Sequence, residues 1–244
     1  MTTKATRPAF YALAPGGWRD YVTLLHLPYT AWHLSYVAIG AALASQFTLR
    51  NMAPVLAAFF LALGVGAHAL DELNGRPLQT SIPSWMLVAL AAFSVAGAVA
   101  LGVAAAAIQR PLIGVFIAAG VFLVVAYNLE LGGGRFHTDL WFALAWGAFP
   151  LLTAYYNAAG RIRLEAVLAA VFAAALSYAQ RQLSTHARAV RREATAVEGQ
   201  IVRRDGSQER LTATTLLRPA ETALRAMAFA TYFLAAALVV MRLG

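Results

Sequence analysis

The chain has 244 residues, of which 60% are hydrophobic and only 12% are charged, and it contains no cysteine. A soluble domain usually carries about 25% charged residues, so this composition excludes an ordinary soluble globule, and the abundance of apolar residues excludes a disordered chain. The lack of cysteine excludes disulfide frameworks, thiolate metal sites and cysteine nucleophiles. We therefore expect an integral membrane protein.

Seven segments are long and apolar enough to form membrane-spanning helices, which need about 20 residues each. They cover residues 22–46, 54–70, 83–108, 111–131, 140–158, 164–183 and 223–241. Pro54, Pro83 and Pro111 stand at span starts, where proline is tolerated, and Pro150 predicts a kink in the fifth span. The expected fold class is an all-α integral membrane bundle of about seven transmembrane helices.

The basic residues predict the orientation of this bundle. Fourteen of the 19 Lys and Arg residues fall on the side of the N-terminus and the even-numbered loops, and five fall on the other side. Cytoplasmic loops collect Lys and Arg, so we expect a cytoplasmic N-terminus and an outside C-terminus in a bacterial-type cytoplasmic membrane. Topology and contact with anionic lipid account for the net charge of +8, so no nucleic-acid partner is expected.

Two regions outside the predicted spans have their own character. Residues 1–21 contain four aromatic side chains and no continuous apolar core, which predicts an interfacial N-terminal segment. The bundle is expected to fill residues 22–244 and to include a basic cytoplasmic loop over residues 184–222. Within that loop, the pair Asp205-Gly206 lies between two strand-like stretches and predicts a small β-hairpin.

The second span ends in a group of ionisable residues. His68, Asp71 and Glu72 follow the spacing of one helix face. Polar groups at membrane depth are usually functional, and carboxylates bind Mg²⁺ together with phosphate oxygens. We expect Asp71 and Glu72 to hold Mg²⁺, with Arg76 nearby, and the alternative is an interfacial helix end that is merely capped by charge.

Further polar residues lie at the ends of the fourth, sixth and first spans. Asn128 precedes Gly132–Arg135, whose backbone N–H groups and guanidinium could hold an anion; the alternative there is a flexible hairpin. Tyr178, Arg181, Gln182 and His186 end the sixth span, and the arginines at 188–192 are expected to touch lipid phosphate. His26 and His33 are seven residues apart and are expected to line a cavity. A retinal protein is excluded because Lys4 is the only lysine.

These features resemble the UbiA superfamily of intramembrane prenyltransferases. The resemblance rests on Leu25–Tyr29 at the start of the first helix, on residues 127–155 with Gly132–Arg135 and Trp146-Gly147, and on the acidic or amide residues that end spans two and six. It covers roughly the first six spans. It implies a UbiA-like helical bundle around a lipid-open cavity with a polar cap at the cytoplasmic face.

The resemblance also implies alkyl transfer from a polyprenyl diphosphate, assisted by Mg²⁺. At the family's four-residue spacing, the first motif reads His68, Glu72 and Arg76, and the second reads Tyr178, Gln182 and His186, so the second motif has no acid. Together, the residue patterns and this resemblance give the following candidate roles: metal binding by Asp71 and Glu72, proton transfer by His68 or His137, and substrate binding by His26, Arg76, Asn128, Arg135, Tyr178, Arg181, Gln182 and His186.

Three functions remain open from the sequence. The first is a UbiA-like enzyme that transfers the prenyl group of a polyprenyl diphosphate, or eliminates diphosphate from it, as a prenyltransferase, cyclase or lyase. The second is a non-catalytic relative that binds an isoprenoid lipid or a quinone, which the missing acids of the second motif favour. The third is a small transporter, which usually shows paired repeats that this sequence does not display. The expected partners are an isoprenoid lipid and membrane lipid.

Overall fold

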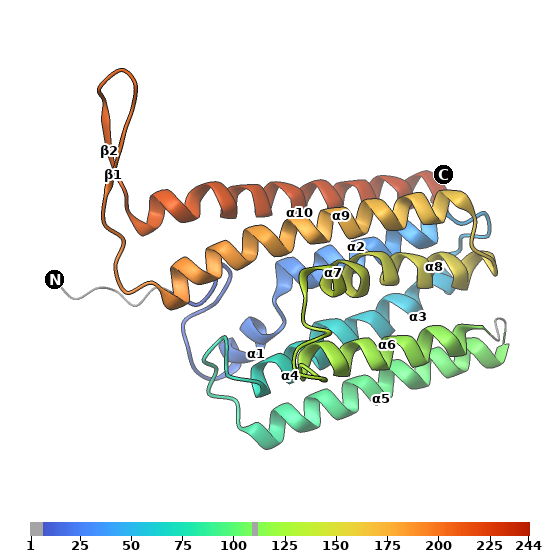
Figure 1. Cartoon of the computed structure of the whole chain (residues 1–244). Coiled ribbons are helices and arrows are strands. Elements are labelled where there is room, and N and C mark those ends of the chain that lie inside the picture. The colour runs from blue at the N-terminus through green and yellow to red at the C-terminus, as the bar shows by residue number, and fades with distance from the viewer. Residues whose placement is uncertain (1–6, 109–111) are drawn as a thin grey trace.

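The computed structural model describes residues 7–108 and 112–244, which form a bundle of long helices with a β-hairpin projecting from one end (Figure 1). The helices, with η marking π-helical segments, are α1 (Trp18–Leu24), α2 (Leu27–Leu43), α3 (Leu49–Phe59), η1 (Phe60–Ala67), α4 (His68–Leu73), α5 (Ser84–Ile108), α6 (Ile113–Asn128), α7 (Asp139–Phe142), η2 (Ala143–Ala148), α8 (Phe149–Ala159), α9 (Leu164–Arg188), η3 (Ala189–Glu193) and α10 (Ala213–Leu243). Strands β1 (Gln200–Val202) and β2 (Gln208–Arg210) pair antiparallel, with Gln200 opposite Arg210.

The helical class predicted from the sequence is confirmed for the described residues. Each of the seven predicted spans falls on helix. Four helical stretches are long and apolar enough to cross a membrane, namely Leu49–Leu73, Ser84–Ala106, Leu164–Glu193 and Ala213–Leu243. The other three predicted spans are shorter or less apolar, and α6 has 16 residues. A count of seven membrane crossings therefore stays a prediction, as does the orientation.

Several predicted boundaries differ from the structure. The second span was expected to start at Pro54, but α3 begins at Leu49, where the Thr48 side chain caps the helix. The basic loop expected over residues 184–222 narrows to residues 194–212, because η3 continues α9 to Glu193 and Thr212 caps α10. The predicted hairpin around Asp205-Gly206 is confirmed. Pro111 lies outside the described residues.

The kink expected at Pro150 stays a prediction, but the structure shows another effect of this residue. Pro150 is the second residue of α8, two residues after the π-helical segment η2 ends. Proline has no N–H, so Pro150 cannot donate to the carbonyl oxygen of Trp146 four residues earlier. That oxygen instead accepts a hydrogen bond from Nδ1 of His33, 2.9 Å away. The missing helical donor thus provides an acceptor for a buried side chain on α2.

Helix α2 occupies the middle of the bundle and packs against α8 and α10, whereas α5 and α6 form a neighbouring hairpin on the other side of α3 (Figure 1). The close approach of α2 to α8 depends on Gly40, because a Cβ at this position would lie 2.2 Å from the carbonyl oxygen of Leu151. Buried Tyr36 ties α2 to α9, since its hydroxyl accepts hydrogen bonds from Trp32 and Ser177. These contacts fix the helices that carry the polar residues described below.

We expect Gly40→Ala to destabilise the protein, because the added methyl group would overlap the backbone of α8. Overpacking of this kind costs about 1–3 kcal/mol. The midpoint of thermal unfolding in detergent should fall by several degrees. Gly114→Ala is the matched control, because nothing lies within 4 Å of its added Cβ. An unchanged midpoint in Gly40→Ala would show that the α2–α8 contact is looser than described.

Candidate functional site

A polar cavity of about 340 Å³ lies at the end of the bundle where α2 begins and α9 ends. Many parts of the fold line it: the segment before α1, the start of α2, the ends of α4 and α6, the loop after α6, α7 with η2, the last turns of α9 with η3, and the first part of α10. Asp71 of α4, Asn128 at the end of α6 and Arg181 of α9 all line this cavity. The structure thus brings polar residues from three helices together around one cavity.

The face of α9 toward the cavity is set by a stripe of small residues. Ala166, Ala170, Ala173 and Ser177 recur at intervals of three or four residues and are buried in the bundle. Residues at such intervals share one helix face. The same stripe continues into polar residues, all of which line the cavity: Gln180, Ser184, Arg188 and Arg191. Close packing of the small residues thus aims these polar groups inward.

Three histidines in the cavity have the same tautomer. In each ring Nδ1 lies within hydrogen-bond distance of a backbone carbonyl oxygen: His33 with Trp146 at 2.9 Å, His68 with Gly64 at 3.1 Å and His137 with Tyr127 at 3.0 Å. A carbonyl oxygen only accepts, so Nδ1 carries the proton and Nε2 keeps its lone pair. Arg181 donates to Nε2 of His137, whereas Nε2 of His33 and of His68 has no partner among the described residues.

His26 completes the group of histidines. Its ring stacks on His68, with the centroids 4.0 Å apart and the planes 14° from parallel. Its Nδ1 lies 3.0 Å from the hydroxyl of Tyr11, which comes from the segment before α1. His26 has a φ of 46°, the left-handed conformation, and it caps α2 just before Pro28. This backbone conformation, which non-glycine residues rarely adopt, accompanies the stacking of the imidazole on His68.

Three buried polar atoms of the site have no hydrogen-bond partner among the described residues: Nε2 of His26, the hydroxyl oxygen of Tyr127 and Oε1 of Gln180. All three residues line the polar cavity. Native proteins leave few buried polar atoms unpaired. The cluster therefore indicates that a ligand or ordered water completes the hydrogen bonding inside the cavity.

The charges around the cavity are unequally paired. Arg181 and Arg191 are neutralised by Asp139 and Glu221, at 3.2 and 2.6 Å. Arg188 donates to Thr185 and Arg192 to the carbonyl of Pro8, and neither has a carboxylate within ion-pair distance in the described part of the chain. Asp71 lines the cavity, and its carboxylate has no hydrogen-bond or ion-pair partner within the described residues. The cavity thus offers two arginines and one carboxylate to a ligand.

Glu72 and Arg76 do not face the cavity. The Glu72 carboxylate accepts hydrogen bonds from the backbone N–H groups of Leu78 and Thr80 and from the Thr80 hydroxyl, at 2.8–2.9 Å. The Arg76 guanidinium donates to the carbonyl of Ile82 and to the Ser84 hydroxyl. Both side chains hold the connection from α4 to α5, because the chain after α4 folds back onto them.

The predicted pairing of Asp71 with Glu72 around Mg²⁺ does not fit this arrangement. Glu72 is committed to the α4–α5 connection, and Asp71 is the member that lines the cavity. Nowhere in residues 7–108 and 112–244 do three or more His, Asp or Glu side chains gather closely enough to hold a metal ion. The predicted magnesium site with two carboxylates is therefore not formed, because Glu72 is held in the α4–α5 connection and Asp71 alone of the pair lines the cavity.

The remaining predicted site residues lie outside the cavity. Arg135 is exposed, and the glycines at 132–134 do not line the cavity. Tyr178 and His186 are exposed on α9, and Gln182 is exposed and donates to Asp139. The family's spacing of 178, 182 and 186 is offset by two residues from the lining stripe, which is about 200° around a helix. The structure brings together His26, His68, Asp71, Asn128, His137 and Arg181.

Sequence reasoning missed two parts of the site. Arg188 and Arg192 were expected to contact lipid phosphate, but both line the cavity. The signal was present, because Gln180, Ser184 and Arg188 continue the spacing of the small-residue stripe. The other missed part is the segment at residues 8–11, which covers the cavity and supplies Tyr11. No sequence pattern indicated that this segment folds over the helix ends.

Comparison with known proteins finds no family model, no curated protein and no solved structure that matches this chain.

The covering segment is tethered next to the site by Asp20. Its carboxylate accepts hydrogen bonds from the N–H of Gly16 at 2.8 Å, and from the N–H and hydroxyl of Ser81 at 2.9 and 2.5 Å. Burial opposes ionisation of this group, but the hydrogen bonds from Ser81 and Gly16 outweigh it and hold the pKa of Asp20 below its ordinary value. Asp20 thus joins the segment before α1 to the α4–α5 connection.

We expect Asp20→Asn to lower the free energy of unfolding by about 1–3 kcal/mol at neutral pH, because hydrogen bonds to an ionised group are lost. A lowered native pKa gives stability that is complete above the unfolded pKa of about 3.9 and is lost as pH falls through the native pKa. The difference between the wild type and the variant, measured by thermal unfolding in detergent, should therefore shrink below about pH 4. Glu198→Gln, an exposed change, is the control. A difference independent of pH would contradict this role.

Proposed function

We propose that the protein binds a polyprenyl diphosphate, with the diphosphate in the polar cavity, and transfers or eliminates its prenyl group as a UbiA-like membrane enzyme. The observation that carries the proposal is the set of groups that the polar cavity leaves available. These are two arginines without carboxylate partners, the Asp71 carboxylate, two bare imidazole nitrogens and three unpaired buried polar atoms. An anionic head group with many acceptor oxygens matches the arginines.

The arginines supply the binding energy for the leaving group. Guanidinium groups form paired hydrogen bonds with phosphate oxygens and stay charged under all ordinary conditions. Arg188 ends α9 and Arg192 lies one turn later in η3, and Arg181 lies two turns before Arg188. A diphosphate beside them would be stabilised as its negative charge grows during bond cleavage.

The aromatic wall suits the other product of that cleavage. When the bond between the first prenyl carbon and the diphosphate oxygen breaks, the oxygen keeps the electron pair and the carbon becomes an allylic cation. The rings of Tyr127, Phe142 and Trp146 lie at 4.7–6.0 Å between centroids and line the cavity. Aromatic faces attract cations, and the Asp71 carboxylate, which lines the same cavity, would add a negative charge.

The histidines provide a base for the final step. In transfer, an acceptor attacks the allylic carbon and loses a proton; in elimination, a neighbouring carbon of the cation loses the proton and a double bond forms. Nε2 of His68 can take that proton, because its Nδ1–H is bound to the Gly64 carbonyl and its lone pair is free. His137 is less suited, because Arg181 already donates to its Nε2.

A second candidate function is the binding of an isoprenoid lipid or quinone without catalysis. One observation favours it: Glu72 is turned away, so Asp71 is the single carboxylate near the centre of the site without a partner among the described residues. The unpaired Tyr127 hydroxyl and Gln180 oxygen would hydrogen-bond the oxygens of a quinol ring. Measurement of turnover separates the two functions.

We expect purified protein in lipid nanodiscs to bind geranylgeranyl diphosphate and to release pyrophosphate. Arg188→Gln should weaken binding about 10- to 100-fold, as expected for loss of charge-assisted hydrogen bonds worth about 1.5–3 kcal/mol. Asp71→Asn should slow release at least about tenfold while binding persists, because its charge faces the developing cation. Titration calorimetry and a pyrophosphate assay give the two readouts.

Arg210→Gln is the matched control for charge, because Arg210 is exposed on the hairpin far from the cavity lining. Glu72→Gln is the control for the neighbouring acid. It should lower the midpoint of thermal unfolding, but it should change the rate of pyrophosphate release by the folded protein very little. Binding without release, in the wild type and in Asp71→Asn alike, would select the non-catalytic function. Absence of binding, or binding that Arg188→Gln does not weaken, would refute the assignment of the diphosphate to this cavity.

A further inference from the structure

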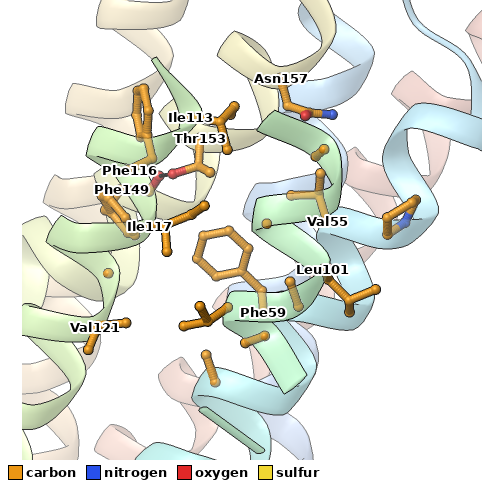
Figure 2. Close-up of a pocket in the computed structure, with 18 of the residues that line it drawn as sticks. Val55, Phe59, Leu101, Ile113, Phe116, Ile117, Val121, Phe149, Thr153 and Asn157 are labelled. Carbon is orange, nitrogen blue, oxygen red and sulfur yellow. Dashed lines mark hydrogen bonds between the residues drawn. The ribbon is translucent and has the colours of Figure 1, made fainter. Parts of the chain in front are cut away.

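A second cavity, apolar and about 390 Å³ in volume, lies between α3, α5, α6 and α8 (Figure 2). Val55 and Phe59 of α3, Ile117 and Val121 of α6 and Phe149 of α8 surround it in the close-up. Small residues on α5 and α6 leave the space open, among them Ala98, Gly102, Ala105 and Gly120. We call this space the apolar cavity.

The apolar cavity ends at the polar cavity on one side. Trp146 lines both cavities, so its indole is a common wall. The Trp146 side chain is 4% exposed, and its ring lies 4.7 Å from that of Tyr127 between centroids. The apolar cavity is therefore a separate space that extends from Trp146 toward the opposite end of the bundle, where α3 begins and α8 ends.

At that opposite end the apolar cavity reaches the molecular surface. Pro54 and Ala104 line it and are also exposed. Two neutral polar side chains at this end make hydrogen bonds within the protein: Thr153 donates to the Phe149 carbonyl at 2.7 Å, and Asn157 donates to the Asn51 carbonyl at 3.2 Å.

Arg50 is the charged group at the mouth of the apolar cavity. It lines the cavity, is exposed, and has no carboxylate within ion-pair distance in the described part of the chain. Arg161 and Arg163 lie in the neighbouring loop at the same end of the bundle, so the surroundings are positively charged. The mouth therefore complements an anionic group.

An apolar cavity of this size is expected to bind an apolar ligand. An engineered apolar cavity of roughly 150 Å³ stays dry and binds small hydrocarbons, because water finds no hydrogen-bond partners there and the lining atoms lack dispersion contacts. The described apolar cavity is larger and opens beside a cationic side chain within a bundle of membrane-type helices. A hydrocarbon chain that carries an anionic head group meets both requirements.

We propose that the apolar cavity binds the hydrocarbon chain of an anionic membrane lipid, which enters at the Arg50 end and pairs its head group with Arg50. The site is distinct from the polar cavity and does not depend on the function proposed for it. The chain lies between the α5–α6 hairpin and α3, with its end against Trp146. The site recognises two features of its ligand, a hydrocarbon chain and a negatively charged head group. A long-chain fatty acid is the simplest probe that has both.

Quenching of tryptophan fluorescence by dibrominated stearate tests the proposal, because bromine quenches an indole that it contacts. With protein in neutral detergent, we expect saturable quenching that is lost in Trp146→Phe. Ala98→Phe fills the apolar cavity and should abolish this quenching, whereas Ala96→Phe, an exposed change on the same helix, should leave it intact. The same measurement with dibrominated stearyl alcohol reports a chain without charge.

The charge of Arg50 at the mouth of the apolar cavity allows a second measurement that does not depend on core packing. Arg50→Gln should weaken stearate binding about two- to fivefold, the range for an exposed ion pair, and should leave binding of the alcohol unchanged. Arg161→Gln, exposed at the same end but not lining the cavity, should change neither. Because Arg50 is exposed, Arg50→Gln should fold normally. Its effect on stearate binding therefore tests the proposal even if Ala98→Phe or Trp146→Phe misfolds.

Three results would overturn the proposal. The first is the lack of any quenching that depends on Trp146. The second is equal binding of stearate and stearyl alcohol with no effect of Arg50→Gln. The third is displacement of stearate by geranylgeranyl diphosphate. That result would show that the ligand of the polar cavity also occupies the apolar cavity. Failure of the proposed enzymatic function, seen as absent pyrophosphate release, leaves all these measurements unaffected.

Discussion

The structure of the polar cavity depends on one constraint: an imidazole buried among apolar helices must find a hydrogen-bond acceptor inside the protein. His33 meets this constraint through the Trp146 carbonyl, which is available because Pro150 cannot donate to it. The bond links α2 to η2 across the middle of the bundle. It also fixes the proton on Nδ1 and leaves Nε2 to the cavity, and the same logic applies to His68 and His137. Satisfying the buried polar groups thus produces a set of oriented bases.

Local pattern predicted the helices well, because apolar length and proline positions are properties of contiguous sequence. It predicted the working face of α9 poorly. The family spacing pointed to Tyr178, Gln182 and His186, but rotation of α9 is set by the buried small residues at its other end. That stripe, from Ala166 through Ser177 to Ser184, is itself legible in the sequence as a repeat of small residues. Packing periodicity was therefore the better guide to the polar residues than the resemblance.

The second span shows where local pattern stops being informative. Spacing placed His68, Asp71 and Glu72 on one helix face, and His68 and Asp71 do line the polar cavity. Glu72 does not line the cavity, because the connection after α4 folds back and the backbone N–H groups of Leu78 and Thr80 donate hydrogen bonds to its carboxylate. The path of a connection depends on distant contacts, here the bond between Asp20 and Ser81. The path of the segment before α1, which covers the cavity, likewise depends on distant contacts and could not be predicted from local sequence.

The aromatic wall determines how strongly the charges in the polar cavity act. The rings of Trp146, Tyr127 and Phe142 pack together along the polar cavity, and Trp146 also lines the apolar cavity, so aromatic rings lie between the two spaces. Arg181 lies over the Phe142 ring at 5.6 Å, so the wall also contacts a cation directly. Charge interactions strengthen as the surrounding dielectric constant falls. An anion beside Arg188 would therefore face a wall whose far side is the apolar cavity. If the proposed function holds, the wall that would shelter an allylic cation would also strengthen the attraction between the arginines and the departing diphosphate.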